Sequence, residues 1–237
     1  MKKLLCMLAA LLLCCAPALA EEGCGQSRPL PEGFQIHIQH SEPCPVEWYA
    51  DALMIGDSIT ESLDLYDCIP GLHIEALIGQ SAQGAINNRT HVVNGQRMTM
   101  ADMVLALAPA KLLIMLGSNG LDNSRPPYVL PSYHKLLDYL LSQRPDMEIY
   151  LLAVTPVRDY VSEQHPRLTN ANVQEFNLGL QELAAQHAVH YVDINTPLLD
   201  EAGRQADRAC VSGDGMHLTR EGAERIAAAL ALQLGEY

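Results

Sequence analysis

Short apolar runs alternate with longer amphipathic segments from residue 52 to the C-terminus. Brief apolar runs favour buried strands, whereas apolar residues that recur every three or four positions favour helices. The runs predict strands at 52–55, 73–78, 111–116, 148–154 and 189–193. The amphipathic segments predict helices at 59–66, 81–88, 99–107, 131–143, 170–186 and 220–234.

This alternation of strand and helix predicts a mostly parallel sheet with helices on both faces. Five strands predict an α/β fold, a three-layer α/β/α sandwich of the flavodoxin-like kind. Residues 21–46 are rich in proline, glycine and charge, so we expect an irregular N-terminal extension there. Residues 35–39 alternate within it like one edge strand. A single domain is then expected over 47–237.

The N-terminus has the pattern of an export signal. Two lysines precede an apolar run at 4–16, and small residues follow it at Ala18 and Ala20. This order predicts a secretory signal peptide over 1–20, cleaved after Ala20. The apolar run is too short to span a bilayer. We therefore expect a periplasmic or extracellular protein without stable membrane insertion.

Acidic residues outnumber basic ones, with 28 Asp and Glu against 15 Lys and Arg, a formal net charge of −13. Removing residues 1–20 takes away two lysines and no acid, which makes the charge −15. Nucleic-acid binding depends on basic side chains that neutralise phosphates, so this balance argues against it. It equally argues against docking on an anionic membrane. The sequence leaves the oligomeric state open.

Four of the seven cysteines remain after cleavage: Cys24, Cys44, Cys68 and Cys210. An even number in an oxidising compartment predicts two disulfides. Three pairings are possible, and we favour Cys24–Cys44 with Cys68–Cys210. The alternative is that some of the four are free buried thiols.

The first predicted strand runs into Gly56-Asp57-Ser58 and then into a helix. This order places the Ser58 hydroxyl at the carboxyl edge of the sheet, where open α/β sheets bind ligands. A serine there can act as a nucleophile if a histidine base reaches it. The ordinary explanation is that Asp57 or Ser58 only caps the helix.

Four more polar or small residues follow predicted strands or precede the last helix. Gly79 follows the second strand, Asn119 follows the third, and Asp214 and His217 precede the helix at 220–234. Each alone has a plain explanation as a turn, loop or capping residue. Together they supply a base, an acid that orients it, and donors for an oxyanion, which acyl transfer to a serine requires.

The order Gly-Asp-Ser, Gly, Gly-x-Asn and Asp-x-x-His resembles the SGNH/GDSL hydrolase superfamily over about residues 52–234. The resemblance implies a serine esterase with a flavodoxin-like fold and no metal or organic cofactor. Ser58 would be the nucleophile, His217 the base and Asp214 its orienting acid. The oxyanion hole would comprise the backbone N–H groups of Ser58 and Gly79 and the Asn119 amide.

Two neighbours depart from the superfamily pattern. Gly120 stands where an acid commonly follows the asparagine, and Gln80-Ser81 follow Gly79 where Gly-Asp is usual. These changes bear on the substrate more than on the chemistry. The same pieces also resemble extracytoplasmic branches that handle O-acetyl groups on cell-wall or other polysaccharides.

Two loops are candidates for the substrate rim: 155–168, with Arg158 and Tyr160, and 121–129, with Arg125 and Tyr128. Solvated loops without a role are the alternative. Only two Phe and one Trp are present, so no large apolar funnel for lipids is expected. We expect small acyl groups, such as acetyl on carbohydrate. Hydrolysis, acyl transfer to a polysaccharide hydroxyl, and a non-catalytic binding role are the competing functions.

Overall fold

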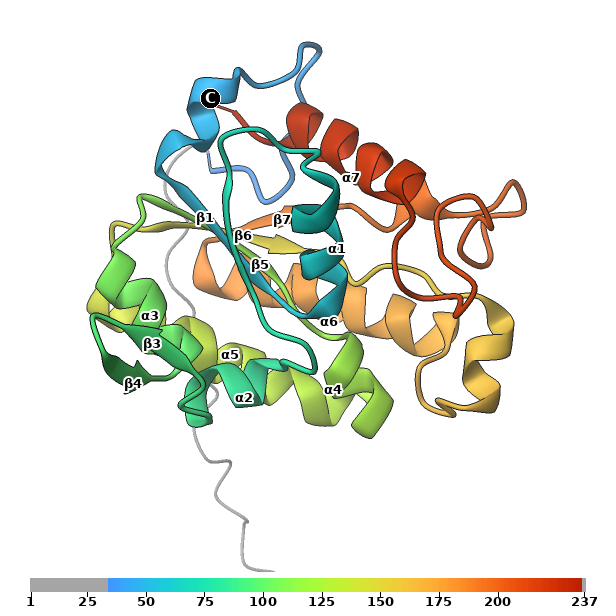
Figure 1. Ribbon diagram of the computed structural model, residues 1–237, viewed down its shortest axis with the longest axis horizontal. Coiled ribbons are helices and arrows are strands. Elements are labelled where there is room, and N and C mark those ends of the chain that lie inside the picture. Colours follow the sequence, from blue (N-terminus) through green and yellow to red (C-terminus); the bar gives the residue numbers. More distant parts are fainter. Residues whose placement is uncertain (1–33, 236–237) are drawn as a thin grey trace, which may run out of the picture.

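The computed structural model of the protein describes residues 34–235 (Figure 1). The predicted signal peptide, most of the predicted extension and Cys24 lie outside the described residues. Within residues 34–235, no helix combines the length and apolar character needed to cross a membrane.

The main sheet is fully parallel and has the strand order β2-β1-β5-β6-β7, which confirms the predicted five-stranded α/β fold. Its strands are β1 (Ala52–Gly56), β2 (His73–Ala76), β5 (Lys111–Met115), β6 (Glu148–Leu152) and β7 (His190–Val192). Every residue of β1 is buried, as expected for a strand that is covered on both faces.

Helices cover both faces of this sheet and complete the three layers (Figure 1). One face carries α2 (Ala82–Asn87), α3 (Met100–Leu107), α4 (Ser118–Asn123), α5 (Pro126–Gln143) and α6 (Asn170–His187). The other face carries α1 (Ser58–Tyr66) and α7 (Arg220–Gln233), which pack against each other. Short 3-10 turns lie at η1 (Val46–Asp51), η2 (Asp159–Glu163) and η3 (Thr196–Leu198).

Several local features differ from the sequence prediction. The short helix α4, which carries Asn119, was not predicted, and it includes the first residues of the loop expected at 121–129. Helix α5 begins at Pro126 rather than at Pro131, because proline is favoured in the first helical turn and Pro131 is accommodated inside the helix. A hairpin of β3 (His91–Val93) and β4 (Gln96–Met98) was not predicted. Its turn residues Asn94 and Gly95 both have positive φ, 51° and 78°, as such tight turns require.

The predicted edge strand at 35–39 is wrong, because this segment adopts bends rather than a strand. It still follows the edge of the sheet. The Ile36 carbonyl accepts a hydrogen bond from Tyr191 N at 2.8 Å, and the Gln35 carbonyl lies 2.8 Å from His190 Nδ1.

The expected Cys68–Cys210 disulfide is not formed, and Cys44 is also a free thiol. The two thiols have different charged neighbours. Cys68 interacts electrostatically with Arg220 and Glu224, whereas Cys210 interacts with Arg225, Asp207 and Glu221.

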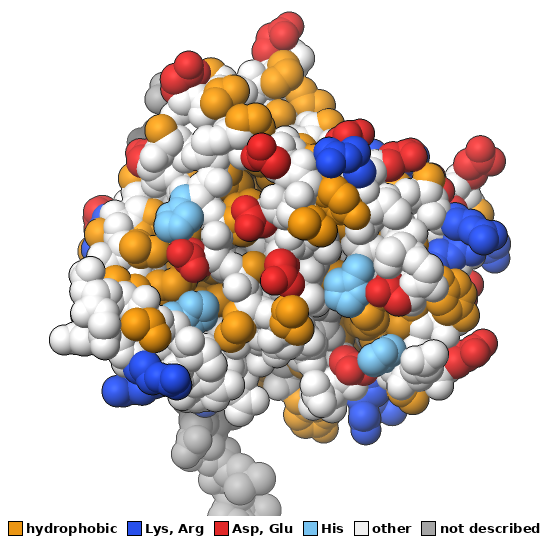
Figure 2. Space-filling model, viewed as in Figure 1, with side chains coloured by type: hydrophobic (Ala, Val, Ile, Leu, Met, Phe, Trp, Pro, Cys, Tyr) orange, Lys and Arg blue, Asp and Glu red, His pale blue; other side chains and the backbone are white. Residues whose placement is uncertain are grey.

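Acidic side chains are spread over the face of the molecule shown in Figure 2. Basic side chains on that face are isolated from one another and form no continuous patch. This distribution agrees with the net charge of −13 and offers a phosphate backbone little to bind on that face.

Candidate active site

Four segments that are far apart in the sequence meet at the carboxyl edge of the sheet. Ser58 is the first residue of α1, directly after β1, and Asp57 caps that helix through a 3.0 Å hydrogen bond from Ile59 N. Gly79 follows β2, and Asn119 lies in the first turn of α4, after β5. His217 comes from the loop that precedes α7.

Ser58, His217 and Asp214 form a continuous chain of hydrogen bonds. His217 Nε2 lies 2.9 Å from Ser58 Oγ, and His217 Nδ1 lies 2.7 Å from Asp214 Oδ2. The spacing allows the imidazole to take the hydroxyl proton while the carboxylate fixes its tautomer. The structure therefore brings together the three residues that the sequence singled out.

The loop that carries Asp214 and His217 is held by hydrogen bonds between its own residues. Asp214 Oδ1 accepts hydrogen bonds from Ser212 Oγ at 2.8 Å, Met216 N at 2.9 Å and His217 N at 3.0 Å. Partial burial raises the pKa of Asp214, but these hydrogen bonds and the one to the His217 ring outweigh it and lower the pKa to about 2. The carboxylate is thus ionised beside the imidazole at neutral pH.

Ser58 and Gly79, whose backbone N–H groups are expected in the oxyanion hole, both line the pocket. The Ser58 N–H belongs to the first helical residue and has no acceptor within the helix. Gly79 lines the same pocket and has a φ of +76°. No atom lies within 4 Å of the place where a Cβ would be, so glycine is needed here for its conformation and not for space.

Asn119 is held by two acceptors. Its Nδ2 donates to Asp57 Oδ2 at 3.0 Å and to the Gln80 carbonyl at 3.1 Å. Ser118 Oγ also donates to Asp57 Oδ2. Burial raises the pKa of Asp57, while the hydrogen bonds from Ser118, Ile59 and Asn119 oppose that rise. Both amide hydrogens of Asn119 are therefore engaged before any ligand binds.

The pocket over Ser58 has a volume of about 230 Å³. Its other lining residues are Ile59, Ile78, Gly79, Ser118, Asn119, Asp122, Thr155, Val157, His165, Leu168, Met216 and His217. Five of the lining side chains are apolar, and the polar ones include the His165–Asp122 pair. That pair is joined by a 3.0 Å contact between His165 Nδ1 and Asp122 Oδ1.

The four predicted rim residues do not line this pocket. Arg158 donates to the Ala206 carbonyl at 2.9 Å, and Tyr160 OH donates to the Gly213 carbonyl at 3.1 Å. Both thus support the loop that carries His217. Arg125 caps α5 through its backbone position.

Tyr128 is exposed and borders a second hollow of about 180 Å³, which shares Asn119 with the main pocket.

Sequence reasoning missed His165 and Asp122, although both belong to the two loops chosen as rims. The choice within each loop rested on arginine and tyrosine as frequent substrate contacts. Asp122 lies in the short helix α4, and His165 follows the turn η2 (Asp159–Glu163). The sequence pattern predicted neither of these two elements.

The chain also resembles known proteins in sequence and in fold. The sequence profile of the GDSL-like lipase/acylhydrolase family matches residues 54–225, which include Ser58, Gly79, Asn119, Asp214 and His217. No sequence in a curated set of proteins matches the chain.

Several solved structures share the fold. A GDSL-like lipase from Bacteroides thetaiotaomicron is 17% identical, with a TM-score of 0.61 over 78% of this chain and 88% of that one. A carbohydrate esterase family 3 protein from Talaromyces cellulolyticus is 17% identical, with a TM-score of 0.55 over 76% and 94%. An acetyl esterase variant crystallised with an acetate ion is 16% identical, with a TM-score of 0.53 over 76% and 94%.

Proposed function

The chain belongs to the GDSL-like lipase/acylhydrolase family and is an ester-hydrolysing enzyme, and we propose that it removes short acyl groups, acetyl above all, from carbohydrate hydroxyls. One observation carries the proposal: the hydrogen-bonded chain from Ser58 Oγ through His217 to Asp214 opens into a small pocket. A serine activated in this way attacks the carbonyl carbon of an ester.

In the proposed mechanism, Ser58 Oγ bonds to the acyl carbon while its proton passes to His217 Nε2. Asp214 stabilises the imidazolium that forms. His217 then gives the proton to the leaving alcohol oxygen, and the acyl group stays on Ser58. Water attacks the acyl-enzyme next, with His217 again taking and returning a proton, so that a carboxylic acid leaves and Ser58 is restored.

The oxyanion of each tetrahedral intermediate needs donors that face it. Two of these donors would be the N–H groups of Ser58 and Gly79, because both residues line the pocket. Asn119 becomes a third donor when one of its amide hydrogens turns from Asp57 or the Gln80 carbonyl toward the oxyanion. The buried Asp57 would then act as a positioning residue for that amide.

Two hollows that share Asn119 support the choice of substrate. The main pocket has several apolar lining residues and a volume of about 230 Å³, which suits a short acyl group better than a long chain. The second hollow is lined mainly by hydroxyl and amide side chains, with the exposed ring of Tyr128 at its edge. Hydroxyl and amide groups bind sugar hydroxyls, and an exposed aromatic ring offers a face on which a sugar can pack.

Two of the similar structures agree with this choice by their own names, since one is a carbohydrate esterase and another an acetyl esterase holding acetate. At 16–17% identity these proteins share the fold with this chain, so the substrate assignment depends on the two hollows and not on the likeness.

Acyl transfer is the second candidate, and the same hollow favours it. A site that holds a leaving alcohol beside Asn119 can also hold an acceptor hydroxyl, because transfer is the reverse of the first half-reaction with a new alcohol. Water and the acceptor then compete for the same acyl-enzyme.

Product analysis tests both candidates. The protein is incubated with O-acetylated oligosaccharides, with and without unacetylated acceptor, and with p-nitrophenyl esters of increasing chain length. We expect free acetate, with a preference for acetyl over chains of eight or more carbons, and no activity in Ser58→Ala. Acetyl-acceptor in place of acetate would establish transfer. A preference for long chains would contradict the short-acyl proposal.

We also propose that the enzyme acts outside the cytoplasm on cell-wall or other polysaccharides. The N-terminal pattern over 1–20 supports export, and the formal charge of −15 after cleavage suits a soluble exported protein.

A further inference from the structure

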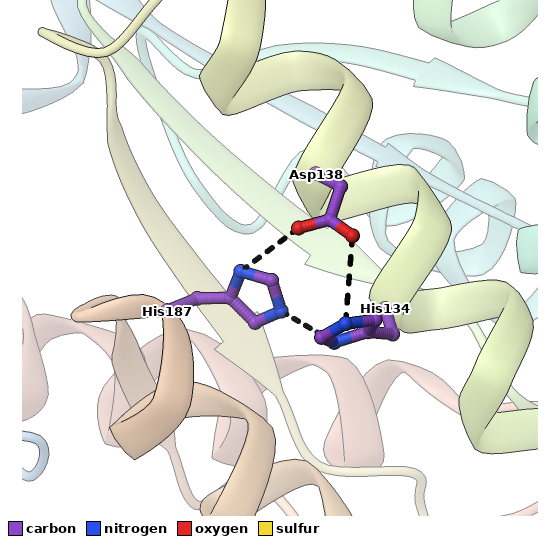
Figure 3. A group of neighbouring side chains, drawn as sticks. All are labelled: His134, Asp138 and His187. Carbon is purple, nitrogen blue, oxygen red and sulfur yellow. Dashed lines mark hydrogen bonds and ion pairs between the residues drawn. The ribbon is translucent and has the colours of Figure 1, made fainter. Parts of the chain in front are cut away.

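A cluster of metal-binding side chains lies outside the esterase site, between α5 and α6. His134 and Asp138 are one helical turn apart on α5, and His187 is the last residue of α6 (Figure 3). Residues four apart project from the same face of a helix, so the first two present a pair of ligands to the neighbouring helix. One candidate ligand atom from each of the three residues lies within 4.8 Å of the others.

We propose that His134, Asp138 and His187 bind one divalent zinc ion. Imidazole nitrogen and carboxylate oxygen are ligands that zinc prefers, and three protein ligands with a water in the fourth position is a common zinc arrangement. The first coordination partners would be His134 Nε2, His187 Nδ1 and an oxygen of Asp138, which face one another across a small triangle (Figure 3).

The distances approach those of such a site. His134 Nε2 lies 3.4 Å from Asp138 Oδ2, and His187 Nδ1 lies 3.8 Å from Asp138 Oδ1. Zinc bonds of about 2.0–2.2 Å separate the ligand atoms of a tetrahedral site by roughly 3.3–3.6 Å. Small side-chain adjustments would therefore bring the three atoms into range.

The surroundings suit a cation. His134 Nε2 is shielded from solvent and makes no hydrogen bond, even though Asp138 Oδ2 lies at 3.4 Å. This geometry is expected when the His134 nitrogen and the Asp138 oxygen both point toward a metal ion and not toward each other. His187 is 5% exposed and stands at the C-terminal end of α6, where the helix dipole favours positive charge. Asp138 is 55% exposed, which leaves a side open for water.

One contact must change when zinc binds. His134 Nδ1 and His187 Nε2 lie 2.7 Å apart, so they share one hydrogen in the metal-free protein. If the neutral rings bind zinc through His134 Nε2 and His187 Nδ1, then His134 Nδ1 and His187 Nε2 each carry a hydrogen. These two N–H groups repel each other at 2.7 Å. We therefore expect the more exposed ring, His134, to move away from His187. No proton is released from neutral rings, so the binding step is balanced.

The zinc site would lie far from the esterase chemistry. Helix α6 leads into the start of β7, so His187 lies at the amino edge of the parallel sheet, whereas Ser58 follows the carboxyl end of β1. The ion would join α5 to α6 and stabilise the fold rather than take part in ester cleavage.

Isothermal titration calorimetry of the chelator-treated full chain with zinc chloride, together with thermal unfolding with and without zinc, tests the proposal. We expect one zinc per chain and an increase in the melting temperature. The double variant His134→Gln/Asp138→Asn should bind at least about tenfold more weakly and lose that increase. Both changes keep the side-chain size at exposed or half-buried positions, and circular dichroism checks the fold. The matched control is His73→Gln, which removes an exposed histidine from its ion pair with Glu75.

Cobalt substitution and imidazole nitrogen NMR distinguish a metal site from a group of side chains that only hydrogen-bond to one another, because such a group would give neither of the signals below. Bound cobalt should show the visible absorption of a four-coordinate ion with nitrogen ligands, and zinc should shift the His134 and His187 ring resonances. Esterase activity should stay the same in the double variant, so failure here would leave the proposed function standing. Absent binding, or equal binding by the double variant, would overturn the zinc proposal.

Discussion

At the residue scale, the two aspartates nearest Ser58 occupy opposite environments. Asp214 is partly exposed and receives several hydrogen bonds, which lower its pKa to about 2. Asp57 is almost fully buried, and this burial raises its pKa although three groups donate to it. Environments that separate the pKa values of two acids also separate their roles. Asp214 is suited to hold a charged imidazole, and Asp57 to hold the Asn119 amide.

Replacing His217 with alanine should lower kcat by at least about a hundredfold, because general-base catalysis contributes roughly 10²–10⁴. Steady-state hydrolysis of p-nitrophenyl acetate measures the loss. His73→Ala is the control, since that histidine is exposed and pairs only with Glu75 among the described residues. Near-normal turnover in His217→Ala would contradict the assigned base.

The site residues that could be predicted are those whose side chain suits the chemistry and whose position follows a predicted strand or precedes a predicted helix. Ser58, Asn119 and His217 each follow a strand or precede a helix, so the topology alone brings them to one edge. Arg158 and Tyr160 were chosen by residue type, and both contact the His217 loop instead of the pocket. Side-chain direction within an irregular loop has no periodicity from which it could be read.

At the scale of elements, the turn between β5 and α4 depends on a glycine. Gly117 has a φ of +144°, and a Cβ there would lie 2.4 Å from Val154 Cγ2 and 2.8 Å from Phe176 Cε1. Both conformation and space exclude a side chain. The turn places Ser118 and Asn119 against Asp57, so its geometry sets the Asn119 amide.

Gly117→Ala should therefore lower the free energy of unfolding by about 2–4 kcal/mol, from overpacking together with backbone strain. Gly79→Ala is the matched comparison, because its φ is also positive but its surroundings are open, and it should lose only about 1–2 kcal/mol. Urea unfolding of both variants measures the difference. Equal losses would show that the contacts of Gly117 with Val154 and Phe176 relax freely.

Elements with strong patterns were predicted almost to the residue. The buried strands β1 and β5 and the capped helix α7 have apolar runs or N-cap residues that mark their limits. The β3–β4 hairpin escaped prediction because its strands are three residues long and largely exposed, so no apolar alternation marks them. Its Asn94-Gly95 turn was the signal available in the sequence.

At the scale of the whole molecule, carboxylates link stability to pH. A hydrogen bond from Tyr139 is the main cause of the lowered pKa of Asp102, and Asp214 is lowered as well. The unfolded chain therefore binds protons at these groups more readily than the folded protein does. Their contribution to stability is present above the ordinary aspartate pKa and is lost as pH falls through the folded values.

We expect the melting temperature to fall between about pH 4 and pH 2. Asp57 acts in the opposite direction, because its pKa is raised, and reduces the slope. Thermal unfolding at several pH values measures the dependence. Asp102→Asn keeps an acceptor for Tyr139 but removes the titration, so its curve should be flatter. An identical slope in that variant would contradict the role given to Asp102.

The fold class of the whole molecule could be predicted because five apolar runs separated by amphipathic segments admit few arrangements. The pairing of Cys68 with Cys210 could not, since it depends on the distance between two sulfurs that are far apart in the sequence. Likewise, the contact of His187 with His134 joins residues 53 positions apart, and no local pattern connects them.

The short loop before α7 has a consequence for engineering. Its ends are joined by the Val211–Leu218 bridge, and Ser212 N donates to the His217 carbonyl at 2.7 Å. The contacts between acid and base are thus set within eight consecutive residues, while Tyr160 OH and Arg158 N hold this octapeptide from outside through the Gly213 and Gly215 carbonyls. A designer who reshapes the acyl pocket, or grafts the octapeptide onto a related scaffold, has to restore these two anchors together with the separation between the imidazole and the serine.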